Sequence, residues 1–221
     1  MSGPLALVGG GEWRAGCTFD KDLLEASGGP DVLVLPTAAA YEHPERAVET
    51  AVAHFARLGA AARGLMVLRR ADALVEAYAD EVREARFVYL SGGSPMHLRS
   101  VLKDSPVWDA LVEAWTGGAV LAASSAGAMV LCDPMVDMRG GAFTVGLGLL
   151  SGLTVLPHHD GWSPEKARRT IHLAPAGLAV VGIDEQTAVI RADGEWSVAG
   201  VGAAAVYVNG QELGLEALPA I

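Results

Sequence analysis

The sequence is poor in cysteine and contains no long apolar run. Only Cys17 and Cys132 are cysteines, and they stand far apart without C-x-x-C spacing, so neither a disulfide framework nor a zinc cluster is expected. No uninterrupted apolar stretch approaches the roughly 18 residues of a membrane span. The N-terminus also lacks a basic region followed by a long apolar core. These absences predict a chain that is neither secreted nor membrane-spanning, in a reducing cytoplasm.

Basic residues are also few relative to acidic ones. The chain has 16 lysines and arginines against 26 aspartates and glutamates, which gives a formal net charge of -10 at pH 7. Because a nucleic-acid surface requires clustered lysine and arginine, no nucleic-acid partner is expected. The charge is compatible with a monomer or with a homodimer, and it says little about the ligand of a local site.

A complete dinucleotide-binding fingerprint is missing as well. Gly9-Gly10-Gly11 follows the first apolar run, but Trp13 and Arg14 stand where the third glycine of G-x-G-x-x-G should come. Nicotinamide binding is therefore not expected. The glycines instead favour a chain that turns closely past an adjacent active site.

The chain does contain a regular alternation of apolar runs and helical segments. With 221 residues, of which 51% are hydrophobic and 19% charged, one compact α/β domain over 1–221 is expected. The alternation predicts a mostly parallel, doubly wound sheet with helices on both faces. Asp193-Gly194 and Asn209-Gly210 predict the turns of a C-terminal antiparallel β-ribbon. Strands are expected at 5–8, 32–35, 64–68, 87–90, 119–123, 153–156 and 178–183, and helices at 44–58, 72–84, 95–101, 105–116 and 164–173.

The stretch 119–129 places a serine at a sharp strand-to-helix turn. An apolar run ends at Ser124-Ser125, and the small residues Ala126 and Gly127 begin a helix. A nucleophile elbow presents its hydroxyl at such a turn and requires small neighbours, although Ala123 stands in place of the first glycine of G-x-S-x-G. The amide of Ala126 would then face an anion formed on a substrate. The alternative interpretation is a packed corner in which the serines only cap the helix.

A second glycine loop, Gly92-Gly93, follows the strand at 87–90. Two glycines at the end of a parallel strand let backbone amides approach a ligand, as the second half of an oxyanion hole requires. The same segment reads as a helix start, with Ser94 as N-cap and Pro95 at the first helical position. The two interpretations are compatible because a cap and an oxyanion loop use the same backbone.

Candidate bases and acids occur at two further strand ends. His158 and His159 follow the strand at 153–156, and since adjacent residues of an extended strand point to opposite faces, only one of them can face Ser125 as its base. The acids Asp184 and Glu185 follow the strand at 178–183, where either could orient a histidine. A Gly- and Asp-rich excursion over 133–144, expected to be irregular, supplies two further acids, which are Asp133 and Asp137.

These motifs together resemble peptidase family S51, which contains aspartyl dipeptidase (peptidase E) and cyanophycinase and whose fold is similar to class I glutamine amidotransferase domains. The resemblance spans nearly the whole chain. It is carried, in family order, by Val8-Gly9-Gly10-Gly11-Glu12, Ser91-Gly92-Gly93, Ser125-Ala126-Gly127-Ala128, Pro157-His158 and Gly182-Ile183-Asp184-Glu185-Gln186-Thr187-Ala188.

The resemblance implies a serine hydrolase with a Ser-His-Glu triad and no metal or cofactor. Ser125 would be the nucleophile, His158 the base and Glu185 the orienting acid. His159 fills the place of an aromatic residue in the family pattern, which leaves the base open between the two neighbours. Asp184 competes with Glu185, and Asp133 or Asp137 would be the acid in the α/β-hydrolase order. The amides of Ala126 and of Gly93 or Gly92 would hold the oxyanion.

The resemblance implies a small peptide as substrate, with preference near an aspartate. An acidic group on the substrate needs a cation or donors, for which Arg139, Arg168, Arg169, Ser94 and His159 are the candidates. Cyanophycinase-like members carry an Arg-rich segment after the histidine and a glutamine in the Gly-Gly loop, whereas residues 160–163 read Asp-Gly-Trp-Ser here and proline stands at 95. Another amide hydrolase or transferase, or a non-catalytic binding domain, are the alternatives.

Overall fold

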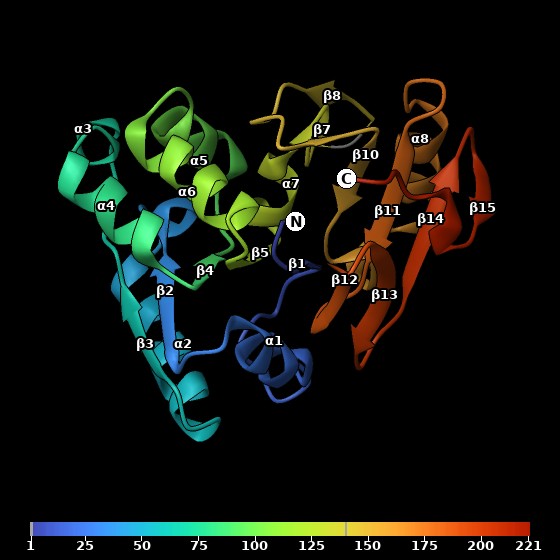
Figure 1. Ribbon diagram of the computed structural model, residues 1–221. Coiled ribbons are helices and arrows are strands. Elements are labelled where there is room, and N and C mark those ends of the chain that lie inside the picture. Colours follow the sequence, from blue (N-terminus) through green and yellow to red (C-terminus); the bar gives the residue numbers. More distant parts are fainter. Residues whose placement is uncertain (1, 140) are drawn as a thin grey trace.

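The computed structural model describes residues 2–139 and 141–221, and a seven-stranded sheet organises it (Figure 1). The strand order is β13-β12-β1-β5-β4-β2-β3. The strands from β1 to β3 in that order are parallel, and β12 and β13 continue the sheet in antiparallel pairing. The mostly parallel sheet predicted from the sequence is therefore confirmed. The bounds are β1 Leu5–Val8, β2 Asp31–Leu35, β3 Ala61–Gly64, β4 Phe87–Leu90, β5 Val120–Ser124, β12 Thr187–Ala192 and β13 Glu195–Gly200.

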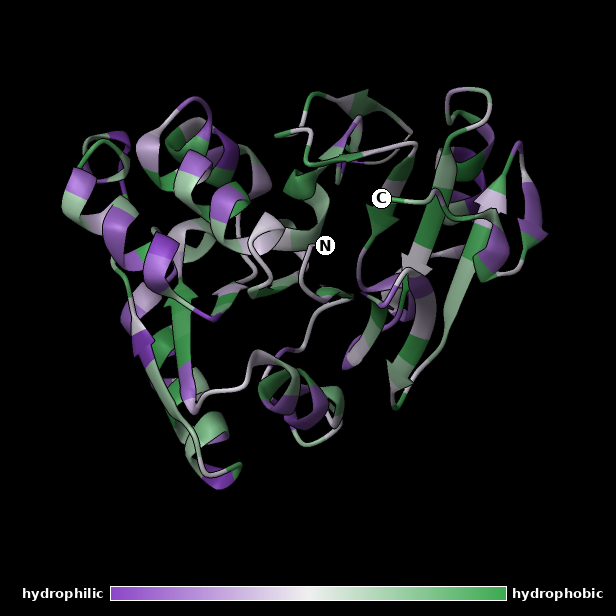
Figure 2. Cartoon of the chain, in the orientation of Figure 1, coloured by the Kyte–Doolittle hydropathy of each residue, from purple (hydrophilic) through white to green (hydrophobic). Residues whose placement is uncertain are grey.

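Helices cover both faces of this sheet, because alternate strand residues point to opposite sides. On β1, Ala6 and Val8 pack in one core with α1 (Phe19–Ser27) and α2 (Pro44–Arg57). Leu5 and Leu7 pack in the other core. The strands are largely hydrophobic, whereas the helices alternate hydrophobic and hydrophilic residues (Figure 2). The helices of the second core are α3 Arg70–Ala73, α4 Glu76–Glu84, α5 Pro95–Leu102, α6 Pro106–Thr116 and α7 Ala126–Leu131.

A second, four-stranded sheet of order β10-β11-β14-β15 stands beside the first (Figure 1). Strands β10 and β11 are parallel, while β14 and β15 pair in antiparallel fashion. The helix α8 (Pro164–His172) joins β10 to β11 along the chain. Its strands are β10 Leu153–Leu156, β11 Ala179–Ile183, β14 Ala204–Val208 and β15 Gln211–Leu213.

The predicted C-terminal ribbon is antiparallel, but it is divided between the two sheets. Asp193-Gly194 joins β12 to β13 in the first sheet, and Asn209-Gly210 joins β14 to β15 in the second. All four turn residues have positive φ, with values of 52°, 84°, 51° and 80°. Two successive residues of positive φ are the type I′ geometry, which matches the twist of the flanking strands.

Three predicted elements differ from the structure. Strand β3 ends at Gly64 and does not begin there. A β-carbon on Gly64 would lie 2.5 Å from Val48 Cγ2 of α2, and Leu65 N–H still donates to Val34 O. The helix expected over 72–84 is broken into α3 and α4, and Asp72 Oδ2 accepts the amides that precede α3. The excursion at 133–144 forms two small strand pairs, which are β6 (Cys132–Asp133) with β9 (Leu150–Ser151) and β7 (Met135–Val136) with β8 (Phe143–Thr144).

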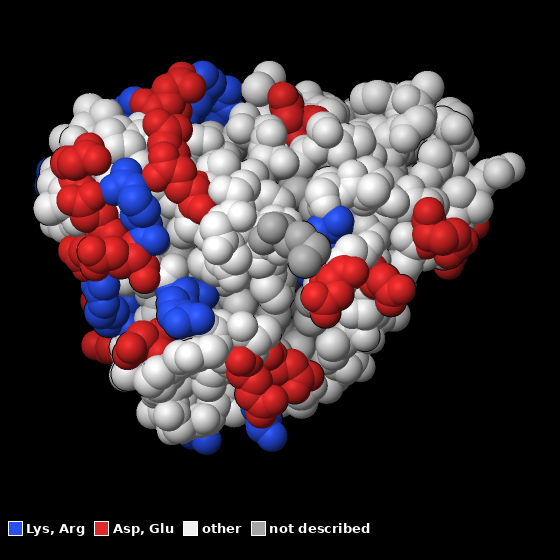
Figure 3. All heavy atoms as spheres, viewed as in Figure 1, with Lys and Arg blue, Asp and Glu red and all other residues white. Residues whose placement is uncertain are grey.

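Charged side chains gather over the outer helices on the left of the view in Figure 3. Arg83 of α4 contacts Glu76 and Asp80 on its own helix and Glu113 on α6. Among the described residues, no helix is long and apolar enough to cross a membrane. Single-turn 3-10 helices complete the fold at Thr37–Ala39, His159–Gly161 and Leu215–Ala217.

Candidate active site

Ser125 lies in a strained turn between β5 and α7. Its φ and ψ are 48° and -108°, a region that non-glycine residues rarely adopt. The Ser125 amide donates to Val8 O at 2.9 Å, which ties the turn to the end of β1. A β-carbon on Gly127 would lie 2.9 Å from Leu90 O, so the first turn of α7 packs directly on β4. Strain of this kind persists where the surrounding structure holds it and is concentrated at functional sites.

Ser125, His158 and Glu185 form one chain of hydrogen-bonding side chains. Ser125 Oγ lies 2.9 Å from His158 Nε2, and His158 Nδ1 lies 2.9 Å from Glu185 Oε1. The His158 and Glu185 side chains are each 36% exposed, so the group is open to a ligand on one side. The serine follows β5 of the first sheet, whereas the histidine and the glutamate follow β10 and β11 of the second. The seam between the two sheets therefore assembles this group.

The Gly9-Gly10-Gly11 loop packs against His158 and Glu185 and accepts two backbone hydrogen bonds from this region. His158 N–H donates to Gly9 O at 2.7 Å, and Gln186 N–H donates to Gly10 O at 2.7 Å. A β-carbon on Gly10 would lie 2.1 Å from His158 Cε1, and one on Gly11 would lie 3.2 Å from Glu185 Oε2. The glycines let the chain pass directly beside the candidate site, as the sequence predicts.

The two neighbouring histidines point in different directions, but not because they lie on an extended strand. His158 has left-handed φ and ψ of 52° and 40°, and the 3-10 helix begins at His159. His159 Nδ1 lies 3.8 Å from Asp184 Oδ1, and its ring centroid is 6.2 Å from that of Tyr207. The other Asp184 oxygen accepts Ala203 N–H at 2.9 Å. His159 and Asp184 thus form a separate pair beside the second sheet.

The acids of the 133–144 excursion have other partners. Asp137 Oδ1 accepts both the backbone amide of Arg139 at 2.9 Å and its Nε at 3.0 Å. These hydrogen bonds lower the pKa of Asp137 to about 2. Asp133 Oδ1 accepts Gly146 N–H at 3.3 Å. In this structure the carboxylate that bonds His158 is that of Glu185, not either of these.

The sequence left the second oxyanion donor open between the amides of Gly93 and Gly92. Gly92 N–H donates to Glu12 Oε1 at 2.9 Å, so this amide already has a partner within the protein. The amides of Gly93 and Ala126 have no hydrogen-bond partner among residues 2–139 and 141–221. Gly93 has a φ of 136°, and a β-carbon there would lie 2.3 Å from Ala38 O. Gly93 and Ala126 are therefore the donors that this geometry leaves available.

Glu12 ends the first motif of the family resemblance, but the sequence analysis assigned it no role at the site. Besides Gly92 N–H, its carboxylate accepts the hydroxyl of Ser124 at 2.8 Å through Oε2. Glu12 therefore contacts both the Gly-Gly loop and the elbow strand. One feature of the sequence could have indicated this role. Glu12 is an acidic residue that directly follows the glycine run after β1, and that run was expected to border the active site.

Ser94 is the N-cap of α5, where its Oγ accepts His97 N–H at 3.3 Å. The capping interpretation of Ser94 and Pro95 is thus confirmed. Pro95 and Met96, which directly follow the Gly-Gly loop, line a cavity of about 380 Å³ with the β7–β8 region. The other lining residues of this Met-rich cavity are Met135, Val136, Asp137, Met138, Arg139 and Thr144.

The three candidate arginines lie in different places. Arg139 lines the Met-rich cavity with a side chain that is 91% exposed. Arg168 lines a cavity around α8 together with His159, Trp162 and Tyr207. Arg169 packs along Gly141, where a β-carbon would lie 2.9 Å from Arg169 Nε. The structure does not bring these arginines together into one anion-binding group.

Both cysteines are free and buried. Burial raises the pKa of Cys17 to about 11 and that of Cys132 to about 12. A thiol of such pKa is a poor nucleophile at neutral pH, because the thiolate is the reactive form. Within residues 2–139 and 141–221, no three His, Cys, Asp or Glu side chains are grouped so that they could hold a metal ion.

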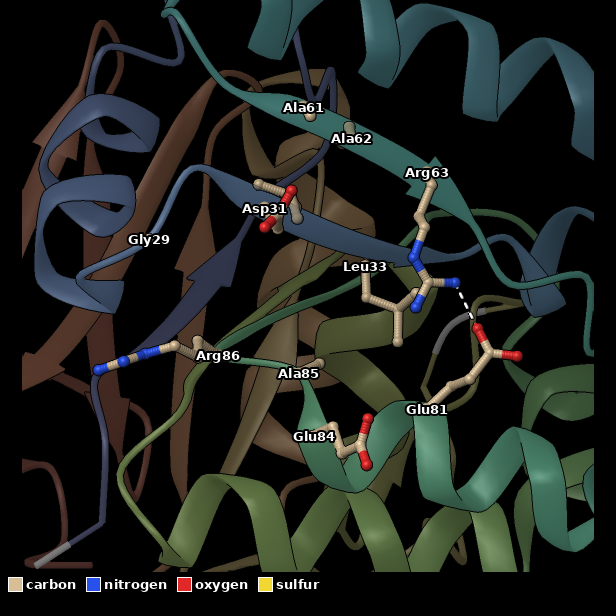
Figure 4. Close-up of a pocket in the computed structure, with 11 residues that line it drawn as sticks. Gly29, Asp31, Leu33, Ala61, Ala62, Arg63, Glu81, Glu84, Ala85 and Arg86 are labelled. Carbon is tan, nitrogen blue, oxygen red and sulfur yellow. Dashed lines mark hydrogen bonds and ion pairs between the residues drawn. The ribbon is translucent and has the colours of Figure 1, made fainter.

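A further cavity lies at the other edge of the sheet (Figure 4). Asp31 and Ala61 line it at the amino ends of β2 and β3, whereas Ser125 follows the carboxyl end of β5. Figure 4 shows Arg63 paired with Glu81 across this cavity. Ligands of open α/β sheets bind outside the carboxyl ends of the strands, so this cavity is not the place where the fold predicts chemistry.

The α/β fold and the arrangement around Ser125 resemble those of serine hydrolases. The chain belongs to peptidase family S51, whose sequence profile matches residues 5–199. The family predicted from the motifs is therefore confirmed.

Individual relatives agree with this family. A crystal structure of a peptidase from an acI-B1 Actinobacterium has 32% identity and a TM-score of 0.86, and the similarity covers 96% of this chain and 93% of that one. The structure of a putative peptidase E protein from Listeria monocytogenes EGD-e, at 18% identity, has a TM-score of 0.68 over 91% of this chain and 100% of that one. This second likeness concerns the fold.

Curated relatives share part of their length with this chain. A cyanophycinase of Synechococcus elongatus is 30% identical over 154 residues, which are 64% of this chain and 48% of that protein. A cyanophycinase of Trichormus variabilis is 33% identical over 131 residues, which are 54% of this chain and 44% of that protein. The chain thus spans about half the length of the curated relatives it matches.

Proposed function

We propose that this chain is a serine peptidase that hydrolyses small peptides through Ser125, His158 and Glu185. The observation that carries the proposal is the pair of 2.9 Å contacts that joins the serine to the histidine and the histidine to the glutamate. A nucleophile, its base and a group that orients the base, linked in this order, activate a serine hydroxyl for attack. Membership in family S51 supports the same activity.

The proposed reaction is acyl transfer through a covalent intermediate. Ser125 Oγ attacks the peptide carbonyl carbon while its proton passes to His158 Nε2. Glu185 accepts a hydrogen bond from His158 Nδ1–H, which leaves the Nε2 lone pair directed at the serine and stabilises the imidazolium that forms. The amine then leaves with the proton from Nε2. A water molecule, deprotonated by the same nitrogen, attacks the acyl-serine, and the acid is released as Nε2 returns the proton to Ser125 Oγ.

The amides of Gly93 and Ala126 are proposed as the donors to the oxyanion. Ala126 directly follows Ser125 in the first turn of α7, and Gly93 belongs to the loop after β4, where a β-carbon on Gly92 would lie 3.4 Å from Ser125 Cβ. Donors that are fixed before the reaction stabilise the developing charge without reorganisation, and the loss of one such donor costs on the order of 10²- to 10³-fold in rate.

A fluorophosphonate probe tests the proposal without knowledge of the substrate. Ser125 Oγ would attack phosphorus, fluoride would leave, and the serine proton would pass to His158. We expect labelling of the wild-type protein at Ser125, labelling of Ser124→Ala, and none of Ser125→Ala. A folded wild-type protein that is not labelled would instead indicate a binding domain that retains the elbow.

We further propose a preference for peptides with an acidic residue near the scissile bond. The support is Arg139, which lines the Met-rich cavity beside the first residues of α5, close in sequence to the Gly-Gly loop. The Arg139 guanidinium already donates hydrogen bonds to Asp137 through Nε and Nη2. A substrate carboxylate would therefore share Arg139 with Asp137. A dipeptide and tripeptide library with aspartate varied over each position identifies the scissile bond and the preference.

Cyanophycin hydrolysis is the second candidate, because the curated relatives with 30% to 33% identity are named cyanophycinases. Against it stand the proline at position 95 and the Asp-Gly-Trp-Ser segment at 160–163, where cyanophycinase-like members carry a glutamine and arginines. Incubation with cyanophycin beside the peptide library separates the two. Release of soluble product from the polymer at a rate above that from every short peptide would favour the second candidate.

A further inference from the structure

Glu12 joins the two segments that would hold a reacting carbonyl. Its Oε1 accepts Gly92 N–H at 2.9 Å, across 80 residues of sequence, and its Oε2 accepts Ser124 Oγ at 2.8 Å, across 112 residues. Ser124 is fully buried, and a β-carbon on Gly92 would lie 3.4 Å from Ser125 Cβ. The carboxylate therefore uses both of its oxygens, one on the residue before the candidate nucleophile and one on a glycine whose backbone borders it.

The loop that carries Glu12 includes a strained tryptophan, Trp13, which packs against Tyr89 of the first sheet. Gly10, Gly11 and Trp13 have φ values of 125°, 62° and 63°. Positive φ is costly for a tryptophan, and Trp13 as a whole is only 3% exposed, with its ring centroid 5.1 Å from that of Tyr89. Tyr89 belongs to β4, the strand that leads into the Gly-Gly loop. The packing of Trp13 on Tyr89 thus offsets the strain and joins the loop that carries Glu12 to the strand that precedes the Gly-Gly loop.

We propose that Glu12 is a positioning residue, whose carboxylate ties the Gly92-Gly93 loop to the elbow strand and thereby fixes the Gly93 amide relative to Ser125 Oγ. This role rests on the function proposed above. It also assigns a task to Ser124, whose hydroxyl is a donor to Glu12 and not a second nucleophile.

The effect follows from the conformation of the glycine loop. Two successive glycines leave a backbone with many accessible conformations, and Gly93 already adopts a φ of 136°. The bond from Gly92 N–H to Glu12 selects one of them, with the next amide, that of Gly93, left free for a ligand. A displacement of about 1 Å at a reacting centre can cost on the order of 10²-fold in rate.

Glu12→Ala, Glu12→Gln and Glu49→Ala test this role, and Glu49 is an exposed residue of α2 that serves as control. For Glu12→Ala we expect the maximal rate of fluorophosphonate labelling to fall about 10- to 100-fold, with the half-saturating probe concentration unchanged. Glu12→Gln should keep a rate within about 3-fold of wild type, because its Oε1 can accept Gly92 N–H and its Nε2 can donate to Ser124 Oγ. Glu49→Ala should match wild type.

Hydrogen exchange gives a readout that does not depend on the reaction. Amides of residues 91–94 should exchange faster in Glu12→Ala than in Glu49→Ala, while those of the buried strand β1 should exchange alike in the two proteins. Unchanged exchange and unchanged labelling in Glu12→Ala would overturn the proposal. Equal losses in Glu12→Gln and Glu12→Ala would overturn it as well, since the charge and not the tether would then matter. Absent labelling of wild type would contradict the proposed function itself, whatever the exchange data.

Discussion

The imidazole of His158 rests against the α-carbon of Gly10. The approach is so close that a β-carbon on Gly10 would lie 2.1 Å from His158 Cε1 and 2.6 Å from Nδ1. Contacts under 3 Å between carbon atoms do not occur without displacement, so any side chain at this position would move the ring. The orientation of His158 therefore depends on Gly10 as well as on Glu185.

Gly10→Ala is expected to abolish most of the reactivity of Ser125. The added methyl group would push the imidazole away from its 2.9 Å contact with the serine, and labelling should fall by on the order of 10²-fold. The matched control is Gly59→Ala, because Gly59 also has positive φ, 79°, but has no atom within 4 Å of an added β-carbon. Its cost should be about 1 kcal/mol of stability, from backbone strain alone, with unchanged labelling. Similar labelling of the two variants in time courses would contradict this prediction.

The layout of the first sheet could be predicted from the sequence because its strands are short apolar runs between helical segments. Runs such as the one over Phe87–Leu90 have few alternatives to a buried strand. The position of β3 could not be predicted in this way. Its burial pattern is mixed, and its end is set by the contact between Gly64 and Val48 of α2, which only the tertiary packing brings about.

The sequence predicted which strand ends meet at the candidate site, but not how the side chains there are oriented. Open α/β sheets bring such ends together, which is why Ser125 and His158 could be expected to meet. The direction of each histidine was set by the left-handed backbone of His158, which a strand-based argument misses. The contacts of Glu12 could not be predicted because its two partners are remote in sequence and no periodicity marks them.

Glu185→Gln is expected to lower labelling of Ser125 by on the order of 10³- to 10⁴-fold. The amide can donate to His158 Nδ1 and so favours the tautomer that carries its proton on Nε2, which cannot accept the serine proton. The control is Asp184→Asn, since Asp184 bonds Ala203 N–H and lies by His159. The second-order rate constants of probe labelling at pH 8 provide the measurement. If labelling slowed more in Asp184→Asn than in Glu185→Gln, the orienting acid would be Asp184 and not Glu185.

The two cysteines are expected to be inert in the folded protein. Burial raises the pKa of Cys17 to about 11 and that of Cys132 to about 12, so at pH 8 both thiols are protonated. For Cys17 the thiolate fraction at this pH is about one in a thousand. Iodoacetamide at pH 8 should therefore leave both residues unmodified in mass spectra, modify both in denaturant, and leave probe labelling of Ser125 unchanged. Modification of Cys17 in the native protein within minutes would contradict this prediction.

The Asp137–Arg139 pair gives the last prediction, which concerns the proposed acidic preference. The arginine lowers the pKa of Asp137 to about 2, so Asp137 is ionised throughout the range in which a histidine base works. It therefore competes with a substrate carboxylate at every such pH. Asp137→Asn should lower KM for an aspartate-containing dipeptide about 2- to 5-fold, and Arg139→Gln should raise it by a similar factor, as expected for exposed ion pairs.

The matching dipeptide with asparagine in place of aspartate is the control for both variants. Its KM should not change, because it lacks the charge that Asp137 and Arg139 would act on. Arg169→Gln provides a second control, since Arg169 packs along Gly141 and does not line the Met-rich cavity. The ratio of kcat/KM for the two dipeptides should be constant from pH 6 to pH 8, since Asp137 does not titrate there. If Arg139→Gln leaves that ratio intact while Arg169→Gln lowers it, the acidic group is recognised beside α8.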